Sequence, residues 1–287
     1  PPRSTLFPYT TLFRSNPTDL IQDGTGMAHY QLKLAYDGTG FFGFQRQGNT
    51  RTVQSVFESV LHEIGWQGDK ILFAGRTDTG VHALGQVVVF DLDWHHADAL
   101  LIKALNAKLP PDAAVESLGR AEAEFHPRYD ASSRRYVYNI YHTPARNPML
   151  DRYAWHIWPA LDPARLNEAA VMFLGRHDFS ALGRAMKPGA STTREVMQSK
   201  WALNGSTLTY EVEANAFLYH MVRRLVFVQV KYAQQKITEE EIRAAVENGK
   251  NIKPGLAPAR GLVLAEVTYP QQKQVIIVDR EILDDMA

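Results

Sequence analysis

Hydrophobic and polar positions follow two different periods along most of this chain, and the two periods alternate. Tyr30, Leu32 and Leu34 recur at period two, which predicts a strand with one buried face. Hydrophobic residues over 53–64 then keep helical spacing, and Thr52 stands where a side chain would cap that helix. The chain therefore combines strands and helices from its first periodic segments.

The same alternation continues to residue 269. Further strands are expected over 84–92, 115–121, 135–141, 195–203, 207–214 and 262–269, and helices over 97–109, 163–174, 217–234 and from 238 onward. Two α+β halves with mixed, largely antiparallel sheets are the simplest account of this order. We assign residues 27–125 to an N-terminal domain, 126–270 to a C-terminal domain and 271–287 to a tail.

The first 26 residues do not share these periods. They repeat a Thr-Leu-Phe unit around Pro8, and they lack the order of basic, apolar and small residues that makes a signal peptide. The segment resembles a translated sequencing adapter, so we expect Met27 to be the natural start. Residues 1–26 are expected to form a disordered, non-native extension.

Composition narrows the class of protein. The 287 residues are 45% hydrophobic and 22% charged, and no apolar run is long enough to span a membrane. The absence of cysteine excludes disulfides, thiolate metal sites and cysteine nucleophiles, and it fits a cytoplasmic protein. Because the formal net charge is zero, nucleic-acid binding would have to come from a local patch.

One such patch is suggested by the second half. Residues 126–226 contain thirteen Lys/Arg and eight Asp/Glu, a net charge of +5. Several of these arginines stand beside aromatic residues, a pairing that suits phosphate contact combined with base stacking. They are Arg134 and Arg135 before Tyr136, Arg152 before Tyr153, and Arg223 and Arg224 after Tyr219. Ordinary solvated arginines would give the same pattern, so it leaves both interpretations open.

Asp78 is the most distinctive candidate for chemistry. It lies in a short polar turn, beside Thr77 and Thr79, between two apolar runs. An aspartate in such a turn is usually solvated or bonded to its own backbone. Asp-Thr-Gly also occurs in aspartic proteases, but that chemistry needs two carboxylates. The chain has no second Asp-Thr-Gly or Asp-Ser-Gly, and Arg76 stands where a protease strand would carry an apolar residue.

The full string GRTDTGVHA, residues 75–83, resembles the catalytic motif of the tRNA pseudouridine synthase A family. Five further stretches are similar to motifs of that family and occur in the same order. They are YDGTGFFGFQRQ (36–47), FHPRYDASSRRYVYNI (125–140), GRHDFSAL (175–182), FLYHMVR (217–223) and APARGLVL (257–264). The resemblance covers about residues 27–270. It implies two ferredoxin-like (RRM-like) halves, with the central sheet flanked by helices.

The resemblance also implies a function. The family isomerises uridine to pseudouridine in the anticodon stem-loop of tRNA, at positions 38 to 40, without metal or cofactor. It implies that Asp78 acts at the ribose, that Arg223 pairs with Asp78, and that Arg76 helps to hold the flipped nucleotide. Tyr136 would stack on the target base, and Leu262 would pack against the pocket. The implied partners are tRNA and a second copy of the chain, and no membrane.

Some residues allow more than one interpretation. Tyr136 and Tyr138 alternate like core aromatics, and Leu264 shares a strand face with Leu262. His82 could be an acid or base, or could join a metal cluster with His95 and His96; we expect that it bonds backbone instead.

The chain departs from the family pattern at Leu182 and, after Arg223, at Phe227, Val230 and Lys231. These changes concern packing near the cleft and put the substrate range in question. A non-catalytic RNA-binding protein with the same halves is the main alternative function.

Overall fold

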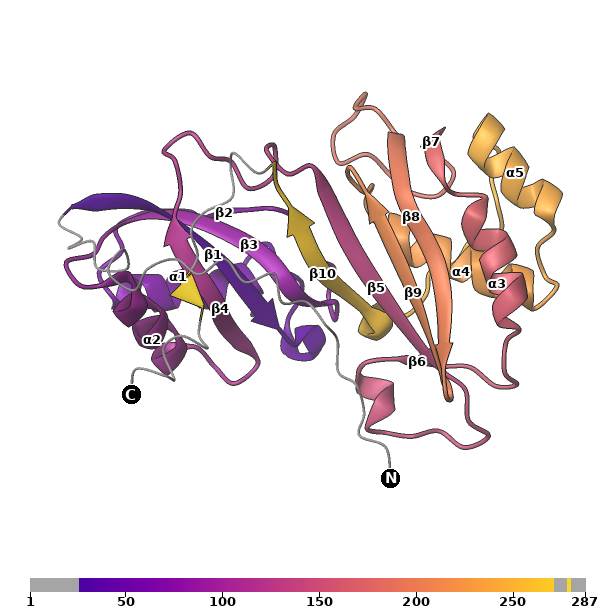
Figure 1. Ribbon diagram of the computed structural model, residues 1–287, viewed down its shortest axis with the longest axis horizontal. Helices are drawn as coiled ribbons and strands as arrows, with labels where there is room; N and C mark the ends of the chain where they lie inside the picture. Colours follow the sequence, from indigo (N-terminus) through magenta and orange to yellow (C-terminus); the bar gives the residue numbers. More distant parts are fainter. Residues whose placement is uncertain (1–25, 271–277, 280–287) are drawn as a thin grey trace.

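The computed structural model describes residues 26–270 and 278–279, and its centre is one continuous β-sheet (Figure 1). Strands follow the spatial order β11-β4-β1-β3-β10-β5-β9-β8-β7, with β2 added to β3 and β6 added to β5. The pairs β3–β10 and β5–β6 are parallel, and the other pairs are antiparallel. The predicted mixed, largely antiparallel sheet is therefore confirmed.

The N-terminal half alternates strands and helices. Its elements are β1 (Met27–Tyr36), α1 (Val53–Glu63), β2 (Leu72–Phe73), β3 (His82–Asp93), α2 (Asp98–Lys108) and β4 (Ala113–Arg120), with a short helix η2 (Gly38–Gly40) after β1. Thr52 caps α1 as predicted, in a reciprocal capping box with Ser55. In space the strands run β4-β1-β3-β2, which is the ferredoxin-like order.

The C-terminal half repeats this arrangement. Its main elements are β5 (Ser133–Tyr141), α3 (Pro163–Val171), β8 (Thr193–Asn204), β9 (Thr207–Ala214), α4 (Met221–Ala233), α5 (Glu239–Asn248) and β10 (Leu262–Thr268). Shorter elements are η3 (Leu150–Arg152), β6 (Trp155–His156), β7 (Gly175–Asp178) and η4 (Ala259–Gly261). The short strand β11 (Val278–Asp279) follows this half and pairs with β4 of the first half. The spatial order β10-β5-β9-β8 matches that of the first half, so two ferredoxin-like halves are confirmed.

The helices α1 and α2 accompany the first half of the sheet, and α3 to α5 accompany the second (Figure 1). Side chains from both halves form one hydrophobic core, because alternate residues of β1, β3, β5, β9 and β10 point to the same face. A smaller cluster on the other face joins Val87 and Val89 to Phe125 and Tyr269. Residues 121–132 connect β4 to β5 beside this cluster, and they include most of the join expected around residues 123–133. The domain boundaries themselves stay a prediction.

The start of α4 was predicted wrongly. The expected helix over 217–234 begins only at Met221, because Tyr219 and Arg184 exchange two backbone hydrogen bonds that keep the preceding segment extended. His220 then turns the chain with a left-handed φ of 64°. This shift affects the site described below, since it places His220 at the start of α4.

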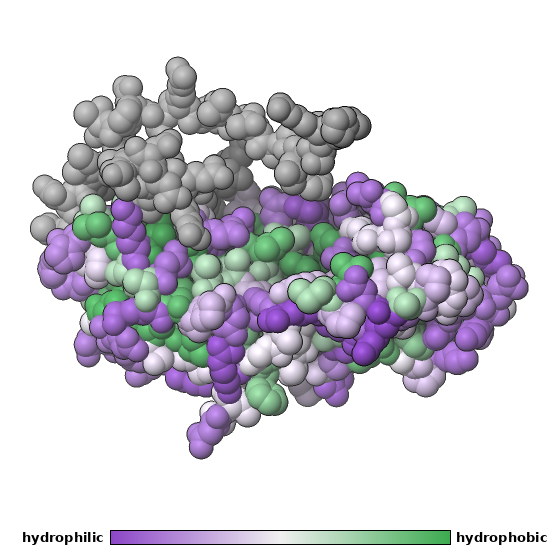
Figure 2. Space-filling view, turned by 90° about the horizontal axis from the view of Figure 1, so that it is seen from below, coloured by the Kyte–Doolittle hydropathy of each residue, from purple (hydrophilic) through white to green (hydrophobic). Residues whose placement is uncertain are grey.

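Hydrophilic and hydrophobic residues intermingle on the face shown in Figure 2. No helix among residues 26–270 has the length and apolar character needed to cross a membrane. The predictions for residues 1–25 and for the tail, β11 apart, lie outside the described residues.

Candidate active site

The turn that carries Asp78 is held by a side chain of β3, the strand that follows it. The buried side chain of Gln86 donates to the Gly75 carbonyl at 2.7 Å and accepts from the Gly75 amide at 3.3 Å. Gly80 takes a left-handed φ of 76°, which glycine adopts without strain. The Val81 amide closes the turn on the Asp78 carbonyl at 3.1 Å. The position of Asp78 is therefore fixed by backbone bonds on both sides.

The loop after β1 supports the same turn from a second side. The Phe44 amide donates to the Thr77 carbonyl at 3.1 Å, and the Thr77 hydroxyl lies 2.7 Å from the hydroxyl of Tyr36. A β-carbon on Gly43 would come within 2.9 Å of the Thr77 carbonyl oxygen, so only glycine fits there. The stretch YDGTGFFGF thus acts on Asp78 through backbone packing.

The carboxylate of Asp78 meets the side chains of Arg223 on α4 and of His220, which precedes this helix. Arg223 Nη1 donates to Asp78 Oδ2 at 2.8 Å, and His220 Nε2 lies 3.3 Å from the same oxygen. The Nε of Arg223 is anchored on the Ala257 carbonyl at 2.8 Å. No described residue donates a hydrogen bond to Asp78 Oδ1. One oxygen of the carboxylate is therefore held, and the other is available to a ligand.

A cavity of about 500 Å³ opens beside this carboxylate. All five residues that the family resemblance implied line it: Arg76, Asp78, Tyr136, Arg223 and Leu262. They come from four separate segments, namely the Asp78 turn, β5, α4 and β10. The fold therefore brings together residues that lie up to 186 positions apart in the printed sequence.

The structure separates the members of two ambiguous pairs. Tyr136 and Leu262 line the cavity, whereas Tyr138 donates to the Pro258 carbonyl at 2.8 Å and Leu264 is a fully buried core residue. Burial raises the pKa of Tyr136 to about 12, with Asp78 acting in the same direction and Arg134 against it. The Tyr136 hydroxyl is therefore protonated at neutral pH.

The charge of the cavity is strongly uneven. Among the described residues that line it, Asp78 is the only carboxylate. The lining cations are Arg76, Arg128, Arg134, Lys187, Arg194 and Arg223. Arg76, Arg128 and Lys187 are exposed at its edge. One carboxylate among six cations suits an anionic ligand and does not suit protease chemistry, which needs paired carboxylates.

The arginines beside aromatic residues have roles that the sequence did not indicate. Arg134 is buried and donates to three backbone carbonyls, and Arg135 forms an ion pair of 2.8 Å with Glu266. The carbonyls belong to Arg128, Ala131 and Asn215. Neither arginine is a free phosphate ligand, and neither is an ordinary solvated one.

The remaining arginines of that set are also engaged within the chain. Arg152 binds Asp37 at 2.7 Å, and Arg224 donates to the carbonyls of Ile252 and Gly255. Local sequence cannot predict these bonds, since most of the partners lie far away in the chain.

His82 bonds backbone, as expected. Its Nδ1 accepts from the Gly38 amide at 3.1 Å, and its Nε2 lies 3.2 Å from the Arg260 carbonyl. Burial lowers the pKa of His82 despite the nearby Asp37. His95 and His96 lie just beyond the far end of β3, and no metal-binding cluster of His, Asp or Glu occurs among the described residues.

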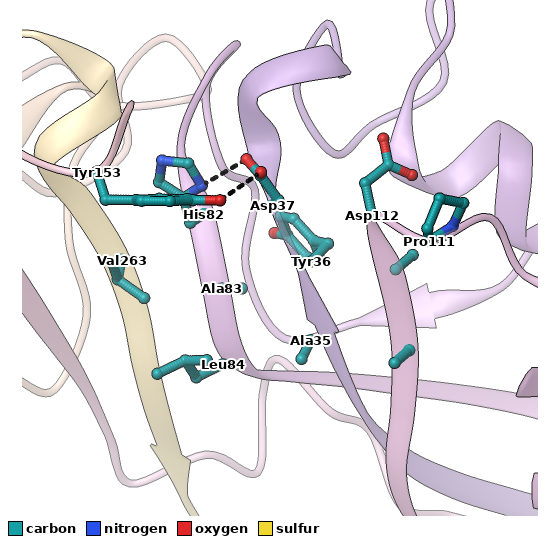
Figure 3. Close-up of a pocket in the computed structure, with 12 residues that line it drawn as sticks. Ala35, Tyr36, Asp37, His82, Ala83, Leu84, Pro111, Asp112, Tyr153 and Val263 are labelled. Atoms are coloured by element: carbon teal, nitrogen blue, oxygen red, sulfur yellow. Dashed lines mark hydrogen bonds and ion pairs between the residues drawn. The ribbon is translucent and has the colours of Figure 1, made fainter. Parts of the chain in front are cut away.

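A second pocket, of about 320 Å³, lies beside the start of β3 (Figure 3). It is lined by Ala35, Leu84 and Val263, which alternate with core residues along their strands. Its polar groups are already paired, since Asp37 contacts both His82 and Tyr153 (Figure 3). None of the five implied site residues lines this pocket.

Sequence reasoning missed His220. No signal in the sequence marks His220, because the left-handed turn that directs its ring depends on backbone bonds between Tyr219 and the distant Arg184. Leu182, Phe227 and Lys231 do not line the cavity. Leu182 is buried in the core, and Phe227 packs against the segment around Gly255.

Comparisons with known proteins agree with this geometry. The sequence profile of the tRNA pseudouridine synthase family matches residues 34–130 and 169–270. A tRNA pseudouridine synthase A of Methylacidiphilum infernorum is 37% identical over 247 residues, covering 85% of this chain and 97% of the relative. One of Colwellia psychrerythraea is 34% identical, covering 84% and 94%. With both halves matched and the motif residues gathered around one cavity, the chain belongs to the tRNA pseudouridine synthase family, whose members are isomerases acting on tRNA.

Proposed function

We propose that this protein isomerises uridine to pseudouridine in tRNA and that Asp78 is the residue acting at the ribose. The observation that carries this proposal is the state of the carboxylate: Oδ2 is held by Arg223 at 2.8 Å, and Oδ1 faces no donor among the described residues. A carboxylate held in this way is oriented and still able to react. A purely structural turn aspartate is usually solvated or bonded to its own backbone, whereas the Asp78 carboxylate contacts His220 and Arg223.

The reaction rearranges bonds within one nucleotide. The bond from uracil N1 to ribose C1′ breaks, the base turns in the pocket, and C5 bonds to C1′; C5 loses its hydrogen and N1 gains one. Asp78 attacks C1′ or helps to remove the proton on C2′, and either role needs one ionised carboxylate. Arg223 supports that charge and fixes its direction.

The remaining cavity residues fit a nucleotide that has left its stack. A volume of about 500 Å³ is within the range of pockets that enclose small ligands. We assign Tyr136 to stacking on the base, Leu262 to packing against it, and Arg76 to the flipped nucleotide's backbone. The exposed cations Arg128 and Lys187 at the edge suit the phosphates on either side.

We further propose the anticodon arm, positions 38 to 40, as the target, a cytoplasmic location and a homodimer as the active form. These rest on the resemblance of the motifs. Light scattering of the purified protein with and without tRNA tests the dimer, and a monomer in both samples would contradict it.

The main test uses unmodified tRNA transcripts. Purified protein is incubated with them without added metal or cofactor, and pseudouridine is mapped by carbodiimide labelling and primer extension. We expect stops at positions 38 to 40, and none in matched transcripts that carry cytidine there. A protein that binds tRNA and forms no pseudouridine in any transcript would support the non-catalytic alternative.

A further inference from the structure

His220 has an unusual backbone conformation for the residue that begins a helix. It adopts φ 64° and ψ 1°, and its side chain makes no capping bond to α4. A side chain with a β-carbon is disfavoured in this left-handed region, so the surrounding structure must impose it. The two backbone bonds between Tyr219 and Arg184 fix the residue before it, and the Arg224 amide donates to its carbonyl at 3.0 Å.

This conformation directs the imidazole of His220 toward the site. Its ring stacks on Tyr219 with 3.7 Å between centroids, and its Nε2 lies 3.3 Å from Asp78 Oδ2. Arg223, in the first turn of α4, reaches the same oxygen. Two side chains of one helix start therefore converge on one oxygen of the carboxylate.

The protonation of His220 suits a donor to a carboxylate. Burial lowers its pKa, and the charges of Arg223 and Arg184 act in the same direction, while Asp78 opposes them. The ring is therefore neutral at pH 7 and carries a single N–H. At 3.3 Å from Asp78 Oδ2, a neutral imidazole contacts the carboxylate without adding a second positive charge beside Arg223.

We propose that His220 is a positioning residue for Asp78, holding Oδ2 together with Arg223 so that Oδ1 is the oxygen presented to the ribose. The inference rests on the proposed function of Asp78. It adds a residue that acts through the carboxylate and touches no substrate atom. Without it, the single hydrogen bond from Arg223 would leave the carboxylate freer to turn about the Cβ–Cγ bond of Asp78.

Two substitutions distinguish the effect of losing the contact with Asp78 from the effect of disturbing the backbone conformation. His220→Asn tolerates the left-handed region well but ends short of Asp78, whereas His220→Gln places an amide nitrogen near the position of Nε2. We expect His220→Asn to lower kcat by roughly 10- to 100-fold, with KM for tRNA within about twofold of the parent. His220→Gln should recover most of the lost kcat.

Two kinetic outcomes would overturn the proposal. Parent kcat in His220→Asn would show that the contact does nothing, and a raised KM with parent kcat would show that His220 binds RNA instead. A loss of kcat in both variants, equal in size and accompanied by a lower melting temperature, would mean that His220 only supports the fold.

A second measurement does not depend on activity. The His220 ring is titrated by NMR in the parent and in Asp78→Asn. Because the carboxylate raises the pKa of His220, its loss should lower that pKa further. An unchanged titration would overturn the contact. A parent protein that forms no pseudouridine would contradict the proposed function, and the titration would still decide whether His220 holds Asp78.

Discussion

Replacing Asp78 by asparagine tests the assignment of the carboxylate most directly. The amide keeps the shape of the side chain and an oxygen that accepts from Arg223, while it removes the charge and most of the nucleophilicity and basicity. Loss of a positioned acid, base or nucleophile typically costs up to about 10⁴-fold. Turnover of Asp78→Asn should therefore fall below detection.

Affinity for tRNA should change little in this variant. A phosphate about 10 Å from Asp78 would be repelled by roughly 0.4 kcal/mol in water, and salt would screen part of that. Removal of the charge should then strengthen binding by at most about twofold. An affinity that falls tenfold would mean that Asp78 anchors the RNA by another contact.

The control for this experiment is that Asp78→Asn remains folded. The pair of Asp78 and Arg223 is mostly buried, with side chains 20% and 16% exposed. Weakening its charged hydrogen bond should cost about 1 to 2 kcal/mol, which lowers Tm by several degrees. Asp78→Asn should thus remain folded under assay conditions, and circular dichroism at the assay temperature verifies it.

The assay is release of tritium from C5 of labelled uridine in tRNA, run beside filter binding. Asp78→Glu is the matched variant, because one methylene moves the carboxylate by about 1 Å and such a displacement costs on the order of a hundredfold. Tritium release by Asp78→Asn near the parent rate would refute the reasoning, since Asp78 would then be a turn residue only.

Three further predictions follow from the contacts. Arg223→Ala should lower kcat more than it raises KM, and an equal change in both would place Arg223 on the RNA rather than on Asp78. Lys187→Gln should reduce the salt dependence of tRNA binding by about one phosphate. The control Lys200→Gln, which breaks a pair with Glu211, should leave the salt dependence unchanged. Equal slopes in the two variants would mean that Lys187 contacts no phosphate. Because burial lowers the pKa of His82, the unfolded chain binds its proton more readily, so stability should fall as pH drops below about 6.5. Thermal melts of the parent should therefore show a steeper loss between pH 7.5 and 5.5 than melts of His82→Asn, and parallel curves would contradict this.

Elements whose cause is local could be predicted well from the sequence. Thr52 and Thr238 both form the capping boxes that their helices need, and the period-two residues of β1 lie in the core. The start of α4 could not be predicted, because it depends on backbone bonds between Tyr219 and the distant Arg184. Periodicity continues through His220 and gives no sign of its left-handed turn.

The site was less accessible to local reasoning. Asp78 and Arg223 were paired through a resemblance, since no spacing rule connects residues 145 positions apart. The three hydrogen bonds from Arg134 to backbone carbonyls could not be predicted from the sequence either. Composition reveals how many arginines are present, and only the fold decides which of them keep a free guanidinium.

The parallel pairing of β10 with β3 has a consequence for synthesis of the protein. Val263 and Leu264 lie against His82 and Ala83, directly after the Asp78 turn, and Leu262 completes the cavity wall. A nascent chain on the ribosome therefore contains Asp78 long before it contains Arg223, Leu262 and the central strand β10. Partly made chains should be unable to modify RNA, and activity should arise in one step when β10 leaves the exit tunnel and docks between the two halves.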